Sequence, residues 1–447
     1  MRRHPAALAL ALVALATTVG AGVPSAASPA AASAPSAAVP GGSAVRDGDT
    51  GVWWYDAMKL GRWHQETTGE GVTVAVIDGG IDVDVPDLRG ADVEKRVTCR
   101  KFPLPSGRKY PSWADHGTAM TTLIAGQGTG NAAGGQGVTG VAPGARVLFF
   151  SNDFNPRNDL EAECSYAEMG WTVVQAAKEG ADVISMSFGG PGLVHLRKYL
   201  AEAQRLGAVL VASNPDRGEQ DDYYPAAHPG VVAVSAMDES SQMWEESPEL
   251  DYATITTPGV GAPAGGLLED GTWVSRGERT GTSGATAITA GALALVKSKY
   301  PDATANQLIQ HLIHFTGGTR GYTWDPLAGF GGLSVNDMLA HDPTRWPDEN
   351  PLLVPRSQAV EQYPMSSYDQ GSAESADDGP DEAASSPSDA QSAAAGEDST
   401  QAQQESGGFP AWGWLTVAVA ASAVLGVVFL GRRGSRAASA GDQAKGE

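Results

Sequence analysis

The chain has 447 residues, and its 52 Asp and Glu outnumber its 30 Lys and Arg, so its formal net charge is -22 at pH 7. A charge this negative argues against a nucleic-acid partner, because phosphate binding requires a basic surface. Two cysteines exclude a disulfide-rich scaffold and a four-cysteine zinc site, and 42% apolar residues are too few for a protein with many membrane spans.

Residues 1–28 have the composition of a signal peptide. Two arginines open the segment, an apolar stretch follows at 6–23, and small residues near its end offer cleavage positions. Residues 29–50 are rich in Ala, Ser, Pro and Gly, which predicts a flexible N-terminal extension. We therefore expect a folded domain that begins near residue 51 and lies outside the cytoplasm.

Strand-like and helix-like segments alternate over residues 51–343. Residues 72–77 form a short apolar, β-branched run, which is typical of a strand buried on both faces. Further strands are predicted at 146–150, 183–186, 208–212 and 231–235, and helices at 118–125, 165–179, 193–206 and 285–296. This alternation predicts a three-layer α/β/α domain with a mainly parallel sheet. Ligands bind such sheets beyond the carboxyl ends of the strands, so polar residues that follow strands are the candidates for chemistry.

Three polar residues stand at the end of a predicted strand or at the start of a predicted helix. Asp78 ends the first strand, His116 enters a helix of small residues, and Ser283 opens the apolar helix 285–296. A serine hydroxyl needs a base to become nucleophilic, an imidazole titrates in the right range, and a carboxylate fixes the tautomer of that imidazole. Each residue alone is typical of a turn, a structural histidine or a helix cap. Their order along the chain (Asp, His, Ser) is one of the orders found in catalytic triads.

At these positions the sequence resembles the subtilisin-like serine proteases. Residues 76–82 (VIDGGID), 116–119 (HGTA) and 281–285 (GTSGA) resemble the aspartate, histidine and serine motifs of that family, and the resemblance extends over about 69–300. It implies that Ser283 is the nucleophile, His116 the general base and acid, and Asp78 the carboxylate that orients the histidine.

The resemblance also covers the substrate-binding side of the site. Residues 180–190 are similar to the strand whose backbone pairs with an extended peptide substrate. Residues 211–214 (VASN) resemble the strand end that carries the oxyanion-hole asparagine, here Asn214. The substrate-binding residues that the resemblance implies are Ser187, Phe188, Gly189, Ala212 and Ser213.

The sequence departs from the family pattern around this site. Ser213 stands where the family usually has Gly before the asparagine, and Pro215 follows the asparagine. Asp115 stands where Gly is common and puts a second carboxylate beside His116. None of these departures removes a catalytic group, but they bear on specificity and turnover.

The order of segments resembles that of the mycosins, which are membrane-anchored subtilisin-like proteases associated with type VII secretion. They have a signal peptide, a short N-terminal extension, a protease domain, a linker and one C-terminal span. The segment between the predicted signal and Asp78 is too short for the folding-assistant propeptide of secreted subtilisins. The aromatic run Trp53, Trp54 and Tyr55 is also mycosin-like.

Residues 344–410 are predicted to form an acidic linker and residues 411–430 a transmembrane helix. Between 357 and 410 there are eleven acidic residues and no Lys or Arg, with too little apolar area to offset the entropy of ordering. The uncharged segment 411–430 is about one bilayer long at helical rise. Arginines follow it at once, so residues 431–447 are predicted to be a cytoplasmic tail.

Two further features leave alternatives open. Cys99 and Cys164 would face an oxidising compartment in this topology, as a disulfide that encloses His116 or as two unpaired thiols. A group of carboxylates would form a calcium loop or remain solvated: Asp82, Asp84, Asp87 and Asp92. No other cofactor is predicted.

The sequence thus predicts a membrane-anchored, extracytoplasmic serine endopeptidase that cleaves protein or peptide substrates through an acyl-enzyme on Ser283. One alternative is a protease-like structural subunit of a membrane secretion complex. Another is an α/β-hydrolase-type esterase in which Asp302 and either His311 or His314 serve Ser283. The esterase requires a glycine where this chain has Ala285.

Overall fold

A computed structural model of the chain describes residues 50–97, 111–130, 136–151, 166–218, 222–317 and 323–370. Its centre is a sheet of nine strands in the order β10-β11-β7-β6-β5-β4-β1-β3-β2. All neighbouring strands in this sheet are parallel except β10 and β11. The strands are β1 (Thr73–Asp78), β2 (Val93–Val97), β3 (Arg146–Ser151), β4 (Val183–Met186), β5 (Val209–Ser213), β6 (Val232–Met237), β7 (Ile255–Pro258), β10 (Thr316–Gly317) and β11 (Gly332–Leu333).

Both faces of the sheet are buried. Along β1, Val74 and Val76 belong to one hydrophobic core, whereas Ala75 and Ile77 belong to the other. This division follows from the two-residue period of a strand, which sends successive side chains to opposite faces. The run of apolar residues in β1 therefore serves two cores, and the predicted α/β domain with a mainly parallel sheet is confirmed.

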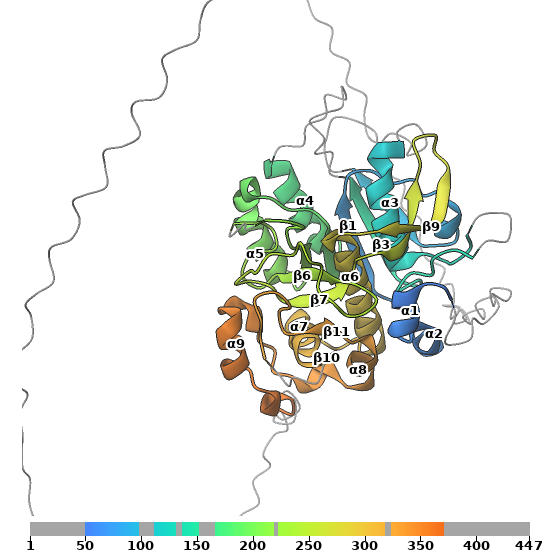
Figure 1. Ribbon diagram of the computed structural model, residues 1–447. Helices are drawn as coiled ribbons and strands as arrows, with labels where there is room; N and C mark the ends of the chain where they lie inside the picture. The colour runs from blue at the N-terminus through green and yellow to red at the C-terminus, as the bar shows by residue number, and fades with distance from the viewer. Residues whose placement is uncertain are drawn as a thin grey trace, which may run out of the picture. The chain divides into compact units, whose positions relative to one another are not determined.

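Helices cover each face of the sheet. The first core contains residues of α3 (Pro111–Ala125), α6 (Thr282–Lys299), α7 (Ala305–His314) and α8 (Val335–Ala340). The second contains residues of α4 (Tyr166–Lys178) and α5 (Arg197–Arg205). Figure 1 shows α4 and α5 (green) together on one flank of the domain and α3 (cyan) on the other.

The strands predicted from the sequence correspond to β1, β3, β4, β5 and β6, with ends displaced by at most two residues. The helix predicted at 118–125 begins earlier, at Pro111, so that Asp115 and His116 lie within α3. Proline is favourable in the first turn because its fixed φ suits the helix and its missing N–H is not needed there. The segment predicted as a helix at 193–206 divides into a 3-10 turn (Pro191–Leu196) and α5.

The described chain begins with two short helices that pack onto the domain, α1 (Trp53–Ala57) and α2 (Leu60–Trp63). The Trp54 side chain is fully buried, and its indole N–H donates to the Pro263 carbonyl at 2.9 Å. The Trp53 indole donates to the Gly261 carbonyl at 3.1 Å. Both carbonyls belong to or adjoin a two-stranded antiparallel sheet of β8 (Ala262–Leu267) and β9 (Trp273–Arg279), which the sequence analysis did not predict.

The predicted start of the linker at residue 344 is wrong, because the fold continues to residue 370. The segment forms α9 (Arg356–Gln362) and three 3-10 turns, Pro343–Arg345, Pro351–Leu353 and Met365–Ser367. Trp346 is fully buried, donates to His311 Nδ1 at 3.1 Å and stacks on His314 at 4.1 Å between ring centroids. These contacts fix the segment through a few large side chains, which a composition argument overlooks.

Several predicted segments lie outside the described residues. They are the signal peptide, most of the N-terminal extension, Cys99, Cys164, the linker after residue 370, the span 411–430 and the tail 431–447. Within the described part of the chain, no helix combines the length and the apolar character that crossing a bilayer requires.

We predict that Trp346→Ala lowers the free energy of unfolding by about 3–5 kcal/mol, because it empties a fully buried site and removes the partner of His311. Leu353→Ala is the control, since Leu353 is 60% exposed in the same segment, and a change within about 0.5 kcal/mol is expected there. Denaturant unfolding of the full chain measures both. Equal midpoints for Trp346→Ala and the unsubstituted chain would show that residues 344–370 are not part of the cooperative unit.

Candidate functional site

The site lies where three neighbouring parallel strands end. Asp78 is the last residue of β1, Ser187 follows β4, and Asn214 follows β5. Because β5, β4 and β1 are adjacent in the sheet, their carboxyl ends meet at one edge. Helix α6 begins at the same place, since Ser283, its second residue, is hydrogen-bonded to Ser187.

Asp78 and His116 form a close pair. The Asp78 carboxylate is buried, and its two oxygens lie 2.9 and 2.8 Å from His116 Nδ1. One of these oxygens also accepts the Gly79 backbone N–H at 2.7 Å, which fixes the carboxylate. The charge of Asp78 raises the pKa of His116 above its ordinary value, against the opposing effect of burial. With Nδ1 held by a carboxylate, the other ring nitrogen is left to exchange protons.

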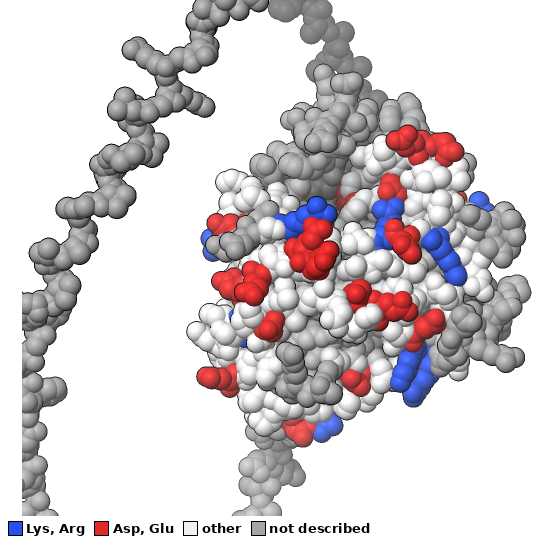
Figure 2. Space-filling view, in the orientation of Figure 1, with Lys and Arg blue, Asp and Glu red and all other residues white. Residues whose placement is uncertain are grey.

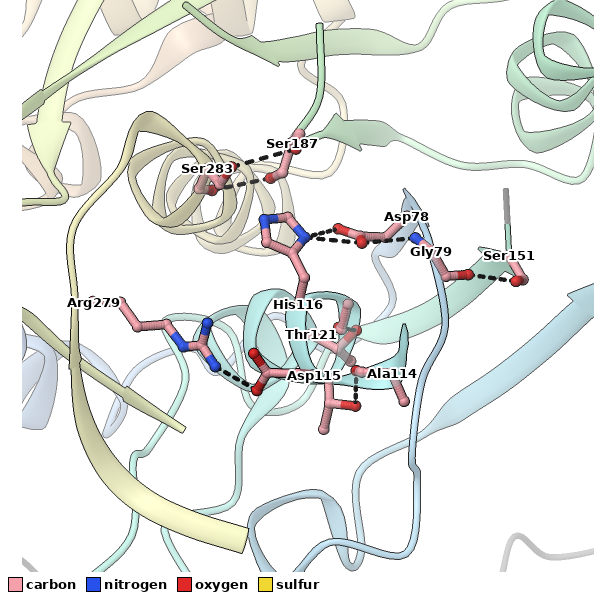
Figure 3. A network of polar contacts seen from close by, with 12 residues as sticks. Asp78, Gly79, Ala114, Asp115, His116, Thr121, Ser151, Ser187, Arg279 and Ser283 are labelled. Atoms are coloured by element: carbon pink, nitrogen blue, oxygen red, sulfur yellow. Dashed lines mark hydrogen bonds and ion pairs between the residues drawn. The ribbon is translucent and has the colours of Figure 1, made fainter. Parts of the chain in front are cut away.

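Ser283 lies beside this pair but bonds elsewhere in the resting site. Its hydroxyl donates to the Ser187 carbonyl at 3.3 Å, and the Ser187 hydroxyl donates to the Ser283 carbonyl at 3.0 Å. No hydrogen bond joins Ser283 to His116 among the contacts of the described residues. Figure 3 shows the imidazole between Asp78 and Ser283, with Nδ1 toward the carboxylate and the other nitrogen on the side of the serine.

Asn214 is tied to the start of α6 through Thr282. The Thr282 hydroxyl lies 2.7 Å from the Asn214 carbonyl and 2.9 Å from Asp216 Oδ1, and the Thr282 N–H donates to the same Asp216 oxygen at 2.9 Å. A carboxylate at a helix N-terminus satisfies an unpaired N–H and complements the helix dipole. Sequence analysis missed Asp216 and Thr282, although an aspartate close to the asparagine of the oxyanion motif was a visible signal.

Asp115, the unusual neighbour of His116, connects α3 to the β8–β9 hairpin. Its Oδ1 accepts the Leu267 N–H at 2.6 Å and forms an ion pair with Arg279 (Figure 3). Arg279 also donates to the Gly265 carbonyl at 2.9 Å. The two charges act on the pKa of His116 in opposite directions: Arg279 lowers it and Asp115 raises it. Arg279 is a further residue that the sequence did not reveal.

The residues predicted to bind substrate fall into two groups. Ser187, Phe188 and Gly189 follow β4, and the Tyr223 ring lies so close to Gly189 that a Cβ there would come within 2.1 Å of it. Ala212 and Ser213 are buried within β5. A hollow of about 510 Å³ lies beside the start of α6. Its lining residues are Pro215, Asp216, Arg217, Tyr223, Trp244 and Thr280.

On the face seen in Figure 2, acidic and basic side chains gather in small clusters. Two of the carboxylates considered for calcium accept hydrogen bonds within the fold, and Asp82 Oδ1 accepts the Asp84 N–H at 3.0 Å. Asp87 is fully buried, with its oxygens accepting from the Gly130 N–H at 2.8 Å and the Trp273 indole at 2.7 Å. In the described ranges, no three His, Cys, Asp or Glu side chains converge as metal ligands would.

The histidines of the esterase alternative are structural. His311 is fully buried between the Met338 carbonyl, at 2.8 Å from Nε2, and the Trp346 indole, which donates to Nδ1 at 3.1 Å. Both ring nitrogens of His314 contact backbone carbonyls, those of Gln310 and Tyr363. Burial lowers the pKa of both histidines, to about 4 for His311. Neither ring has a nitrogen left to serve Ser283.

Several known proteins are similar to this chain. Subtilisin E of Bacillus subtilis (strain 168) is 32% identical over 253 residues, 56% of this chain and 61% of that protein. Fervidolysin of Fervidobacterium pennivorans is 27% identical over 296 residues, 62% of this chain and 41% of that protein. The chain thus spans less than two thirds of the length of either relative. The solved MycP3 protease from the type VII (ESX-3) secretion system is similar with a TM-score of 0.52 and 27% identity, over 65% of this chain and 88% of that one.

The segment that contains the Asp78–His116 pair, Asn214 and Ser283 is also the segment that carries the family signal. Residues 69–331, more than half of the chain, match the Subtilase family. The protein is therefore a member of the subtilase family.

Proposed function

We propose that this protein is a serine endopeptidase of the extracytoplasmic membrane face, with Asp78, His116 and Ser283 as its triad. The single observation that carries the proposal is the placement of His116, whose Nδ1 is held by a buried carboxylate while its ring lies beside a serine at a helix start. Membership of the subtilase family also supports the proposal that these residues act in peptide hydrolysis.

In the proposed reaction, the Ser283 hydroxyl leaves the Ser187 carbonyl and attacks the carbonyl carbon of the scissile peptide. The free ring nitrogen of His116 takes the serine proton and then protonates the leaving amine, and Asp78 stabilises the imidazolium between these steps. The acyl-enzyme on Ser283 is hydrolysed by water activated by the same imidazole.

The oxyanion of the tetrahedral intermediate is stabilised by the Asn214 amide and the Ser283 backbone N–H. The Thr282 hydroxyl supports this assignment, because its hydrogen bond to the Asn214 backbone carbonyl connects the end of β5 to the first turn of α6. Donors fixed in this way contribute more than mobile ones, since they need no reorganisation during the reaction. The substrate backbone pairs with residues 187–189 in an extended conformation.

The likeness to the MycP3 protease supports a mycosin-like role in type VII secretion. The predicted signal peptide and the uncharged segment 411–430 support a domain held outside the membrane by one C-terminal helix. In this arrangement the acidic chain after residue 370 is the spacer between domain and membrane, and the substrate is a protein or peptide outside the cytoplasm.

Ser283→Ala and His116→Ala are each expected to lower kcat for peptide hydrolysis by about 10⁶-fold, because the nucleophile and its base act as one unit. Ser298→Ala, near the other end of α6, is the control and should leave turnover unchanged. A peptide library cleaved by the full chain provides the measurement. Turnover that survives either triad substitution would contradict the proposal, and no turnover by the folded, unsubstituted chain would favour the structural-subunit alternative.

Arg279→Gln and Asp115→Asn should move the acidic limb of the pH profile of kcat/KM in opposite directions along the pH axis. The reaction requires neutral His116, so the rate rises with pH through the pKa of this group. Loss of Arg279 raises that pKa and moves the limb to higher pH, whereas loss of the Asp115 charge moves it to lower pH. Glu278→Gln, an exposed neighbour, is the control. A limb that stays in place, or moves the same way in both variants, would refute this assignment.

The full chain should fractionate with membranes and require detergent for extraction, because the uncharged segment 411–430 is proposed to cross the bilayer. A variant that ends at residue 410 should be released in soluble form while retaining its peptidase activity. Extraction of the full chain by alkaline carbonate alone would contradict the anchor and leave the proposed chemistry unaffected.

A further inference from the structure

The Asn214 side chain is buried and bonded at one end only. Asn214 is 2% exposed, and its Nδ2 lies 2.9 Å from the hydroxyl of Ser235. Its Oδ1 is also buried and has no hydrogen-bond partner among the described residues. Buried polar atoms are rarely left without a partner, so the contact with Ser235 is the one side-chain hydrogen bond that holds this carboxamide among the described residues.

Ser235 reaches Asn214 because of the register of two adjacent strands. In β5 and β6, Ser213 pairs with Val234, and the Asn214 N–H donates to the Val234 carbonyl at 3.0 Å. Asn214 and Ser235 are the next residues on the two strands and therefore lie side by side. Ser235 is itself 2% exposed, so water does not compete for its hydroxyl.

A serine hydroxyl can bond either end of a carboxamide, since it both donates and accepts. When it accepts from Nδ2, one of the two amide hydrogens remains available. When it donates to Oδ1, both remain available. In either case a second contact point restricts rotation of the Asn214 side chain, whose backbone carbonyl is already held by Thr282 at 2.7 Å.

We infer that Ser235 is a positioning residue of the oxyanion hole, which holds the Asn214 amide so that an N–H faces the developing oxyanion. This inference rests on the proposed function, because it assigns Ser235 a role only through Asn214. Preorganised donors act on the transition state more than on the bound substrate, so Ser235 should affect kcat and leave KM nearly unchanged.

The test compares kcat and KM of the full chain with those of Ser235→Ala, Ser235→Thr, Asn214→Ala and the double variant. Asn214→Ala should lower kcat by about 10²–10³-fold. Ser235→Ala should lower it by about 3- to 10-fold, the ratio that corresponds to one neutral hydrogen bond. Ser235→Thr keeps the hydroxyl and should restore most of the rate. In the Asn214→Ala background, Ser235→Ala should have no further effect.

Thr172→Ala is the matched control. Thr172 lies in α4, is fully buried, and its hydroxyl donates one hydrogen bond to the Glu168 carbonyl at 2.9 Å. The substitution removes a buried, hydrogen-bonded hydroxyl from a helix that contributes no residue to the site, so kcat should not change. The melting temperature of each variant separates loss of fold from loss of positioning.

Four outcomes would overturn the inference while leaving the proposed peptidase intact. They are an unchanged kcat in Ser235→Ala, an effect confined to KM, a loss that multiplies with that of Asn214→Ala, and an equal loss in Thr172→Ala. An unchanged kcat in Asn214→Ala would remove the donor through which Ser235 acts. An unsubstituted chain that cleaves no peptide would refute the proposed function and this inference with it.

Discussion

The parallel alignment of β5, β4 and β1 is the constraint on which the site depends. It brings the carboxyl ends of three strands to one edge of the sheet. Asp78 is the last residue of β1, and Ser187 and Asn214 come just after β4 and β5. Helix α6 packs against the same strands within the first hydrophobic core and places Ser283 at that edge. A shift of one strand by one residue would turn its side chains to the opposite face and separate these groups.

A second set of polar contacts links the helix of His116 and the strand end at Asn214 to distant parts of the chain. Asp115 joins the helix of His116 to Arg279, which is 164 residues away in sequence. Asp216 and Thr282 join Asn214 to α6. Helix α1 contacts the same β8–β9 hairpin, because the Trp54 indole donates to the Pro263 carbonyl in β8. Long-range hydrogen bonds and ion pairs of this kind hold side chains in fixed rotamers. Donors that stabilise a transition state electrostatically must be held in this way before the reaction begins.

Much of this arrangement was predictable from the sequence, since strands buried on both faces are continuous apolar runs, Asp78 ends the first of them, and Ser283 precedes an apolar helical run. The β8–β9 hairpin was not predictable, because β8 (APAGGL) has neither alternating polarity nor β-branched residues. The order of residues 344–370 was hidden for another reason: a few large side chains, such as Trp346, hold a segment of mostly short turns. The resting bond of Ser283 to Ser187 and the partners of Asp115 are tertiary contacts that no local pattern encodes.

The most direct measurement of the central claim is the site of covalent labelling by a fluorophosphonate probe, mapped by mass spectrometry on the intact chain. The probe reacts with a serine only when a base and an oxyanion hole activate it. The account predicts a single adduct on Ser283 that disappears when His116 is replaced by alanine. An adduct on another serine, or labelling of Ser283 that persists without His116, would contradict the assignment of the triad.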